Sequence, residues 1–359
     1  MKHTTSITTN QKVASLAHGY PHAKRSFNYK QAFKLESGNV LHGFHLTYET
    51  FGSLNKTKNN AVWVFHALTG DSNPTDWWSG LVGNNKSIDP KHDFIICVNM
   101  PGSHYGSINP LSINTESGKS FLHEFPLITT RDMANMYSLL QQSLGINKVK
   151  LGIGGSMGGM QLLEWSILQP KLFKNIVLIA TNAQHSPWGI AFNETQRMAI
   201  ENDPTWMNSN PNGGSNGLAT ARAIAMLSYR NYMPYQVTQH ETSPNSIDSF
   251  KASSYQQYQG TKLTNRFNAH SYYTLTKSMD AHNVGRSRES VEAALQLIEA
   301  NTIIVGIESD LLFPIAEQRF LANNIRDAKF ETINSIYGHD GFLVEYAQLS
   351  YILKKHLKA

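Results

Sequence analysis

A serine between closely spaced glycines is the clearest candidate for covalent chemistry in this sequence. Ser156 lies in Gly154-Gly155-Ser156-Met157-Gly158, after an apolar run at 149–153 and before a helical pattern at 157–168. A serine in such a sharp strand-to-helix turn is presented as a nucleophile, and the glycines let strand and helix approach closely. The helix N-terminus would offer the Met157 backbone N–H to a developing oxyanion. The pattern therefore predicts acyl transfer through Ser156, although a bare Gly-x-Ser-x-Gly also occurs in ordinary glycine-rich turns.

A second oxyanion donor is expected from the loop after an earlier strand. Residues 66–70, His-Ala-Leu-Thr-Gly, follow the apolar run 61–65. The backbone N–H of Leu68 is the candidate donor. The alternative is a simple turn between a strand and a helix.

His339 is the preferred general base. It lies in Tyr337-Gly338-His339-Asp340-Gly341, a loop between the last predicted strand and the last predicted helix. The chain order serine, acid, histidine places the acid at the end of the preceding strand, where Asp310 is the candidate and Glu308 the alternative. His339 would take the Ser156 proton, and Asp310 would fix the imidazole tautomer. Weaker candidates for the base are His66, His104, His123 and His282.

Short apolar strands that alternate with helical patterns must position these groups. The first two strands read as a hairpin around Ser37-Gly38-Asn39, and the others lack polar alternation, as strands covered on both faces do. Strands are predicted at 29–35, 40–48, 61–65, 94–98, 149–153, 176–180, 302–307 and 330–333, and helices at 130–144, 157–168 and 315–324. With the serine turn, this predicts an α/β-hydrolase fold with a mostly parallel sheet flanked by helices.

The segment between the sixth and seventh predicted strands has a different pattern. Helices are indicated at 196–200, 219–229 and 271–280, and an Asn/Gly-rich loop at 208–217, with no convincing strand. We expect residues 182–300 to form a helical lid inserted into a core domain of residues 26–181 and 301–359. Residues 1–25 are expected to be a flexible leader.

Composition excludes several classes of protein. The 359 residues are 40% hydrophobic and 16% charged, with a net charge of +5 from scattered basic residues. No apolar run is long enough to span a membrane, and no basic cluster suggests nucleic-acid binding. Neither a secretory signal nor a metal-ligand motif is evident. The single cysteine, Cys97, cannot form an intrachain disulfide, and a chain without disulfides fits the reducing cytoplasm. Its apolar neighbours indicate that Cys97 is a small buried side chain.

The sequence resembles the homoserine O-acetyltransferase family over nearly all of residues 30–355. The matching residues include 66–70, 98–102, 105–106, 109–110, 112–114, 125–126, 129–132, 154–161, 196–197, 203–206, 217–218, 221–222, 258–260, 309–314 and 338–340. The stretch 207–211 departs from the family pattern, and the loop 100–104 as a whole differs from its commoner form. The departures concern the entrance for the acyl donor.

The resemblance implies an activity and further site residues. It implies acetyl transfer from acetyl-CoA to L-homoserine in methionine biosynthesis, by a ping-pong mechanism without a metal or other cofactor, in a homodimer packed through lid helices. Arg222 then looks like the residue that binds the substrate carboxylate, Tyr229 like its hydroxyl neighbour, and Asp340 like the partner of the substrate ammonium. From the residues alone, Arg222 could instead form a surface ion pair, Tyr229 a core contact and Asp340 a helix N-cap.

Other functions stay open at this point. A succinyl donor, L-serine as the acceptor, a plain carboxylesterase and a catalytically dead binding protein all fit the fold. An intact Ser156, Asp310 and His339 argues against a dead protein. Arg222 together with Asp340 argues against an esterase, because a neutral ester needs neither charge.

Overall fold

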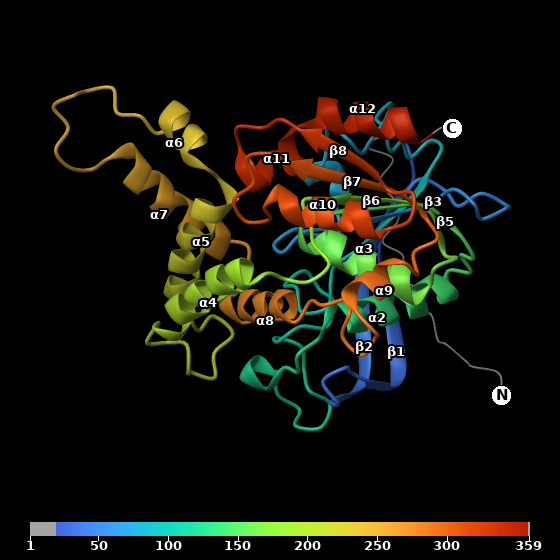
Figure 1. The fold of residues 1–359 in the computed structure, drawn as a ribbon. Coiled ribbons are helices and arrows are strands. Elements are labelled where there is room, and N and C mark those ends of the chain that lie inside the picture. Colours follow the sequence, from blue (N-terminus) through green and yellow to red (C-terminus); the bar gives the residue numbers. More distant parts are fainter. Residues whose placement is uncertain (1–18, 358–359) are drawn as a thin grey trace.

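Apolar runs without polar alternation form the centre of one sheet, because both of their faces are covered by helices. The computed structural model describes residues 19–357, and over that range the sheet has eight strands (Figure 1). The strands are β1 (His22–Lys34), β2 (Val40–Phe51), β3 (Ala61–Phe65), β4 (Phe94–Val98), β5 (Val149–Gly155), β6 (Phe173–Ile179), β7 (Asn301–Ile307) and β8 (Lys329–Ile333). Every residue of β3 is buried, as its composition predicts.

The order of the strands brings distant segments to one edge of the sheet. The order is β1-β2-β4-β3-β5-β6-β7-β8. β2 is antiparallel to both β1 and β4, whereas the strands from β4 to β8 pair in parallel. Because parallel strands end at the same edge, the segments after β3, β5, β7 and β8 all emerge together there. The mostly parallel sheet of an α/β-hydrolase fold is thus confirmed.

Helices cover both faces of the sheet, and a further group of helices lies beyond one end of its strands. They are α1 (Pro74–Trp77), α2 (Thr130–Ser143), α3 (Met157–Leu168), α4 (Pro187–Glu201), α5 (Ser215–Tyr229), α6 (Tyr232–Thr238), α7 (Lys251–Thr264), α8 (Ala269–Asp280), α9 (Val291–Leu295), α10 (Ile315–Asn324), α11 (Gly341–Val344) and α12 (Tyr346–His356), with 3₁₀ turns at Leu122–Glu124 and Gly338–Asp340. Trp63 and Phe65 of β3 pack with α2 and α3 in one apolar core, and Val62 and Val64 pack with α12 in the other.

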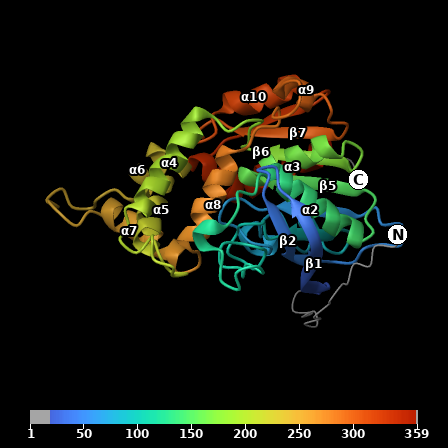
Figure 2. The ribbon, with the colours of Figure 1, turned by 90° about the horizontal axis from the view of Figure 1, so that it is seen from below.

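The chain between β6 and β7 forms the helices α4 to α9. We refer to residues 182–300 as the helical insertion. Both views show α4 to α8 gathered at one end of the sheet, beyond the strand ends (Figures 1 and 2). Within it, α5 packs against both α4 and α7. Among the helices that the structure describes, none is long and apolar enough to cross a membrane.

Several expected boundaries were wrong. β1 begins at His22, so residues 22–25 belong to the sheet rather than to the expected leader, whose first 18 residues lie outside the described part. α5 begins at Ser215, within the expected loop 208–217. His339 does lie between the last strand and the last helix, as expected, in a 3₁₀ turn. α7 was not predicted, because its sequence carries no apolar stripe.

Candidate active site

The Ser156 turn is a strained junction between β5 and α3. Ser156 adopts φ +55°, a backbone conformation that side chains with a Cβ rarely take. Its neighbours are glycines because the backbones touch: a Cβ on Gly154 would lie 2.6 Å from the carbonyl of Gly158, and one on Gly158 would collide with the Phe65 carbonyl. The Ser156 N–H donates to the Ile179 carbonyl at 2.9 Å. The turn is therefore held by the sheet in the shape that presents the serine.

Ser156, His339 and Asp310 form one hydrogen-bonded chain. His339 Nδ1 lies 2.6 Å from Asp310 Oδ2, and His339 Nε2 lies 2.8 Å from Ser156 Oγ. Since the carboxylate only accepts, the proton of a neutral imidazole sits on Nδ1, and Nε2 accepts from the serine hydroxyl. The other carboxylate oxygen, Oδ1, accepts the backbone N–H groups of Leu312 and Phe313 at 2.8 and 2.9 Å. The structure thus brings together the three residues expected from the sequence.

The alternative candidates lie elsewhere or make other bonds. Glu308 is exposed at the end of β7, whereas Asp310 is buried. His104 pairs with Asn268 at 2.6 Å, and His123 pairs with the Trp206 carbonyl at 2.9 Å. His282 is buried between the Thr130 hydroxyl and the Asn182 carbonyl, each 3.0 Å away.

His66, another weak candidate for the base, instead orients the loop before α1. The Met100 N–H donates to His66 Nε2 at 3.0 Å, which leaves the ring proton on Nδ1, 2.9 Å from the Ala67 carbonyl. Burial lowers the pKa of His66, so the ring is neutral in this position. The Ala67 carbonyl also accepts the Gly70 N–H at 2.9 Å.

His66 bonds to the carbonyl of the peptide between Ala67 and Leu68, and the N–H of that peptide is the expected oxyanion donor. In a trans peptide the C=O and N–H point in opposite directions, so fixing the Ala67 carbonyl also fixes the Leu68 N–H. Met157 is the first residue of α3, where backbone N–H groups have no partner within the helix. Leu68 follows β3 and Met157 follows β5, and these two strands are neighbours in the sheet. The two expected donors therefore come from adjacent strand ends.

A pocket of about 510 Å³ opens onto Ser156 and His339. Arg222 and Tyr229, one above the other on α5, both line it, and the Arg222 guanidinium lies 5.2 Å from the centre of the Tyr229 ring. Burial raises the pKa of Tyr229, so its hydroxyl stays protonated and can donate a hydrogen bond. The residues expected to bind substrate thus line the same pocket as the serine and the histidine.

Asp340 lines the pocket as an ion-paired carboxylate. Arg230 Nε donates to Asp340 Oδ2 at 2.8 Å, and both side chains are mostly buried. Asp340 occupies the N-cap position of α11, but its side chain makes no capping hydrogen bond. The N-cap alternative is therefore wrong. Sequence reasoning missed Arg230, although its place directly after Tyr229 was a signal.

Comparisons with known proteins identify the family. A family model described as the α/β-hydrolase fold matches residues 60–346. The homoserine O-acetyltransferase of Cyclobacterium marinum is 49% identical over 91% of this chain and 93% of its own length. That of Trichormus variabilis is 43% identical over 89% and 90%. The chain belongs to the homoserine O-acetyltransferase family.

Solved structures agree on the fold of this family member. The homoserine O-acetyltransferase of Staphylococcus aureus has a TM-score of 0.78 at 28% identity, over 94% of this chain and 96% of that one. Esterase E22 has a TM-score of 0.85 at 23% identity, over 94% and 100%. At that identity the esterase shows the fold alone. The fold is thus shared with hydrolases, and the pocket must decide the reaction.

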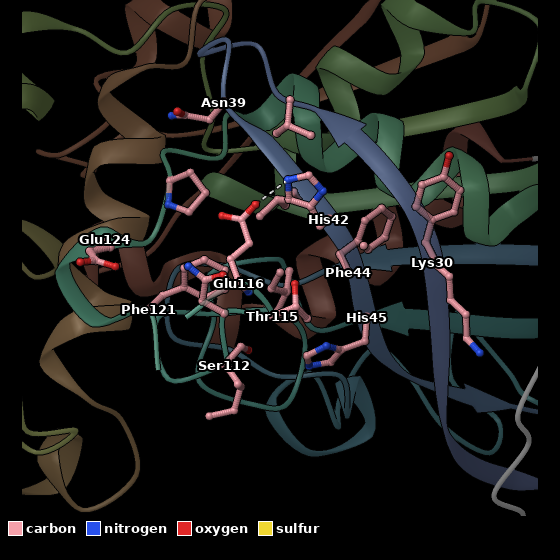
Figure 3. A pocket seen from close by; sticks show the side chains of 18 of the residues that line it. Lys30, Asn39, His42, Phe44, His45, Ser112, Thr115, Glu116, Phe121 and Glu124 are labelled. Atoms are coloured by element: carbon pink, nitrogen blue, oxygen red, sulfur yellow. Dashed lines mark hydrogen bonds and ion pairs between the residues drawn. The ribbon is translucent and has the colours of Figure 1, made fainter. Parts of the chain in front are cut away.

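A larger hollow in this family member, of about 780 Å³, lies between β1, β2 and the loop 108–126. Figure 3 shows His42 and Glu116 in its wall pointing toward each other. Their charged groups lie 3.0 Å apart, and both side chains are more than half exposed. The hydroxyl of Ser112, which lines this hollow, accepts a hydrogen bond from the Asn109 N–H and, among residues 19–357, has no histidine partner like that of Ser156. We therefore assign the chemistry to the smaller pocket, where serine and histidine meet.

Several other residues of the smaller pocket were given no role from the sequence, among them four polar ones from different parts of the chain. Thr69 and Tyr105 come from loops after β3 and β4, and Lys262 and Arg266 come from the insertion. They lie in segments that matched the family or adjoin them, but nothing in their spacing indicates a common site. Only the docking of the insertion on the sheet brings them together.

Proposed function

We propose that this chain is a homoserine O-acetyltransferase, which transfers acetyl from acetyl-CoA to the hydroxyl of L-homoserine through an acyl-Ser156 intermediate. One observation carries the proposal: the pocket that holds Ser156 and His339 also holds a guanidinium, Arg222, and a carboxylate, Asp340. An α-amino acid carries the two complementary charges, whereas a neutral ester carries neither. The product is an activated homoserine, which we place in methionine biosynthesis in the cytoplasm.

The first half-reaction acylates the serine. Ser156 Oγ attacks the thioester carbonyl carbon as its proton passes to His339 Nε2, which lies 2.8 Å away. Negative charge develops on the carbonyl oxygen, and the N–H groups of Leu68 and Met157 are the donors for it. The carbon–sulfur bond then breaks, and His339 returns the proton to the departing coenzyme A sulfur. Asp310 stabilises the imidazolium between these steps.

The second half-reaction deacylates the serine by the same route in reverse. The homoserine hydroxyl loses its proton to His339 Nε2 and attacks the acetyl carbonyl carbon. The bond to Ser156 Oγ breaks, and His339 protonates the serine. Arg222 binds the substrate carboxylate, Tyr229 donates to it, and Asp340 binds the ammonium. Arg230 Nε donates to Asp340 Oδ2 and so fixes the position of the carboxylate that lines the pocket.

Water competes with homoserine for the acyl-enzyme, so the site must exclude it. Ser156 and His339 are only 5% and 3% exposed. The insertion supplies one wall of the pocket through Arg222, Tyr229 and Met279. We propose that the insertion acts as the lid of the active site, and that acetyl-CoA and homoserine enter in turn.

Thiol release tests this function. The protein is incubated with acetyl-CoA or succinyl-CoA, each with L-homoserine, L-serine or no acceptor, and free coenzyme A is followed. We expect turnover with acetyl-CoA that depends on L-homoserine, and none in Ser156→Ala. Thiol release that is unaffected by either amino acid would favour the esterase and refute the transferase. Faster turnover with succinyl-CoA or L-serine would reassign the donor or the acceptor.

We also propose that the chain forms a homodimer through the insertion. Large apolar side chains lie exposed on and between α5, α6 and α7, at Leu227, Tyr232, Met233, Val237, Ile247, Phe250 and Tyr258. Exposed large apolar side chains that are concentrated in one part of the chain are typical of a contact between proteins. Light scattering after size exclusion is expected to give a dimer, and Val237→Glu should weaken it. The control Ile113→Glu should leave the dimer intact, because Ile113 is similarly exposed but lines the larger hollow. A monomeric wild type would contradict the proposal.

A further inference from the structure

One arginine of the insertion is bonded to the loop that carries the expected oxyanion donor. Arg266, just after α7, donates from Nη1 to the Thr69 carbonyl at 2.6 Å and from Nη2 to the Thr69 hydroxyl at 3.2 Å. Nη1 also donates to the Tyr105 hydroxyl at 2.6 Å. A single guanidinium thus joins the insertion, the loop after β3 and the loop after β4.

The bond to Thr69 acts on the peptide groups around Leu68. The Thr69 carbonyl and the Gly70 N–H belong to one peptide, and that N–H donates to the Ala67 carbonyl at 2.9 Å. The Ala67 carbonyl in turn shares a peptide with the Leu68 N–H. Because each trans peptide is rigid, holding the Thr69 carbonyl restrains the direction of the Leu68 N–H through two linked peptides.

The partners of Arg266 show that its charge is used in these bonds. The ion pairs among residues 19–357 do not include Arg266, so its charge faces a carbonyl and two hydroxyls rather than a carboxylate. Hydrogen bonds from a charged donor are about twice as strong as those between neutral groups. Phe267, the next residue, packs edge-on against the Tyr105 ring at 5.6 Å and seats the same segment on the core.

We propose that Arg266 is a positioning residue for acyl transfer: it holds the loop 67–70 so that the Leu68 N–H points at the developing oxyanion. The oxyanion site is then complete only when the insertion is seated on the sheet. The inference needs acylation of Ser156 but not the identity of the acceptor. It therefore rests on only the first half of the proposed function.

Acylation by two donors of different size tests the inference. Arg266→Gln, Arg266→Lys and the surface control Arg319→Gln, whose guanidinium lies over the Phe330 ring, are compared with the wild type. Acetyl-CoA and p-nitrophenyl acetate are the donors, and thermal melting verifies that each variant is folded. Losing a whole oxyanion donor costs about 10² to 10³ in kcat, so a misdirected one is expected to cost about 10- to 100-fold.

The expected result is a similar fall in the acylation rate with both donors, with little change in KM for acetyl-CoA. Arg266→Lys keeps the charge but not the fork of donors, so it should recover only part of the loss. Guanidinium chloride should partly restore Arg266→Ala, because the side chain is exposed, but not Ser156→Ala.

Two outcomes would overturn the inference. A raised KM for acetyl-CoA with unchanged turnover of p-nitrophenyl acetate would show that Arg266 binds coenzyme A, together with the nearby cation Lys262. Unchanged rates with both donors would show that the contact with Thr69 is only structural. p-Nitrophenyl acetate acylates Ser156 without any amino-acid acceptor. A wild type that is acylated but does not respond to homoserine would therefore refute the proposed function. The role of Arg266 in acylation would still be decided by comparing the variants with the wild type.

Discussion

Asp310→Asn isolates the role of the buried carboxylate in the hydrogen-bonded chain. The change keeps the shape of the side chain but replaces one acceptor oxygen with an NH₂ donor. Oδ1 accepts two backbone N–H groups, from Leu312 and Phe313, so the amide oxygen must stay on that side. The NH₂ group is therefore forced toward His339 Nδ1, 2.6 Å away in the wild type. The ring then carries its proton on Nε2 and cannot accept the Ser156 proton.

The expected loss follows from this wrong tautomer. An equivalent change in a serine–histidine–aspartate site lowers kcat by about 10⁴-fold. That corresponds to about 5 kcal/mol in the activation free energy. The assay is thiol release from acetyl-CoA with L-homoserine, with stability followed by thermal melting.

The matched control is Glu308→Gln, which removes the neighbouring acid that the sequence left as the alternative. Glu308 is exposed, so activity should stay within about twofold of the wild type. A folded Asp310→Asn variant with more than about a tenth of the wild-type activity would refute the tautomer argument. A large loss in Glu308→Gln would refute the assignment of the acid.

Three further predictions concern the acceptor site, the turn and the core. Arg222→Lys should raise KM for L-homoserine about 10- to 100-fold, because it loses the fork that binds a carboxylate, while the acylation rate with acetyl-CoA stays unchanged. Gly158→Ala should lower stability by about 1–3 kcal/mol in thermal melting, because its Cβ meets the Phe65 carbonyl. Burial lowers the pKa of His282 to about 4 in the folded protein, against about 6.5 in the unfolded chain. The full stability is therefore present above pH 6.5, where the ring is neutral in both states. Stability is lost as the pH falls between these values, by about 2 kcal/mol from pH 7 to pH 5, and urea unfolding of His282→Gln should show a shallower loss.

The sequence was sufficient to predict the three hydrogen-bonded residues, because the topology of the sheet brings the ends of their strands together. Ser156, Asp310 and His339 follow β5, β7 and β8, whose parallel pairing brings their carboxyl ends to one edge. Apolar runs predicted those strands, and α3 and α10 were predicted with their observed bounds. A motif at a strand end can therefore be placed in space before any contact is known.

The contacts made by the insertion could not be predicted in the same way. α7 packs on α5 through Gly260, which lies against the Ala219 backbone, rather than through an apolar stripe. Arg230 and Asp340 are paired across 110 residues, and the pairing depends on how α5 meets the turn before α11. Neither contact leaves a periodic signal, since each depends on the fit of two surfaces.

Under the proposed function, the side chains that separate a transferase from a hydrolase of this fold belong to the insertion or are held by it. Arg222 and Tyr229 lie on its helix α5, and its Arg230 holds the core residue Asp340. Its Arg266 holds the loop that carries the Leu68 N–H. Under the proposals above, acceptor binding and oxyanion stabilisation both require the insertion to be seated, although the nucleophile and base follow strands of the sheet. An insertion displaced from the sheet would leave Ser156 and His339 paired but would open the acyl-enzyme to water. Hydrolysis by a variant such as Arg230→Gln is thus the side reaction that the geometry predicts.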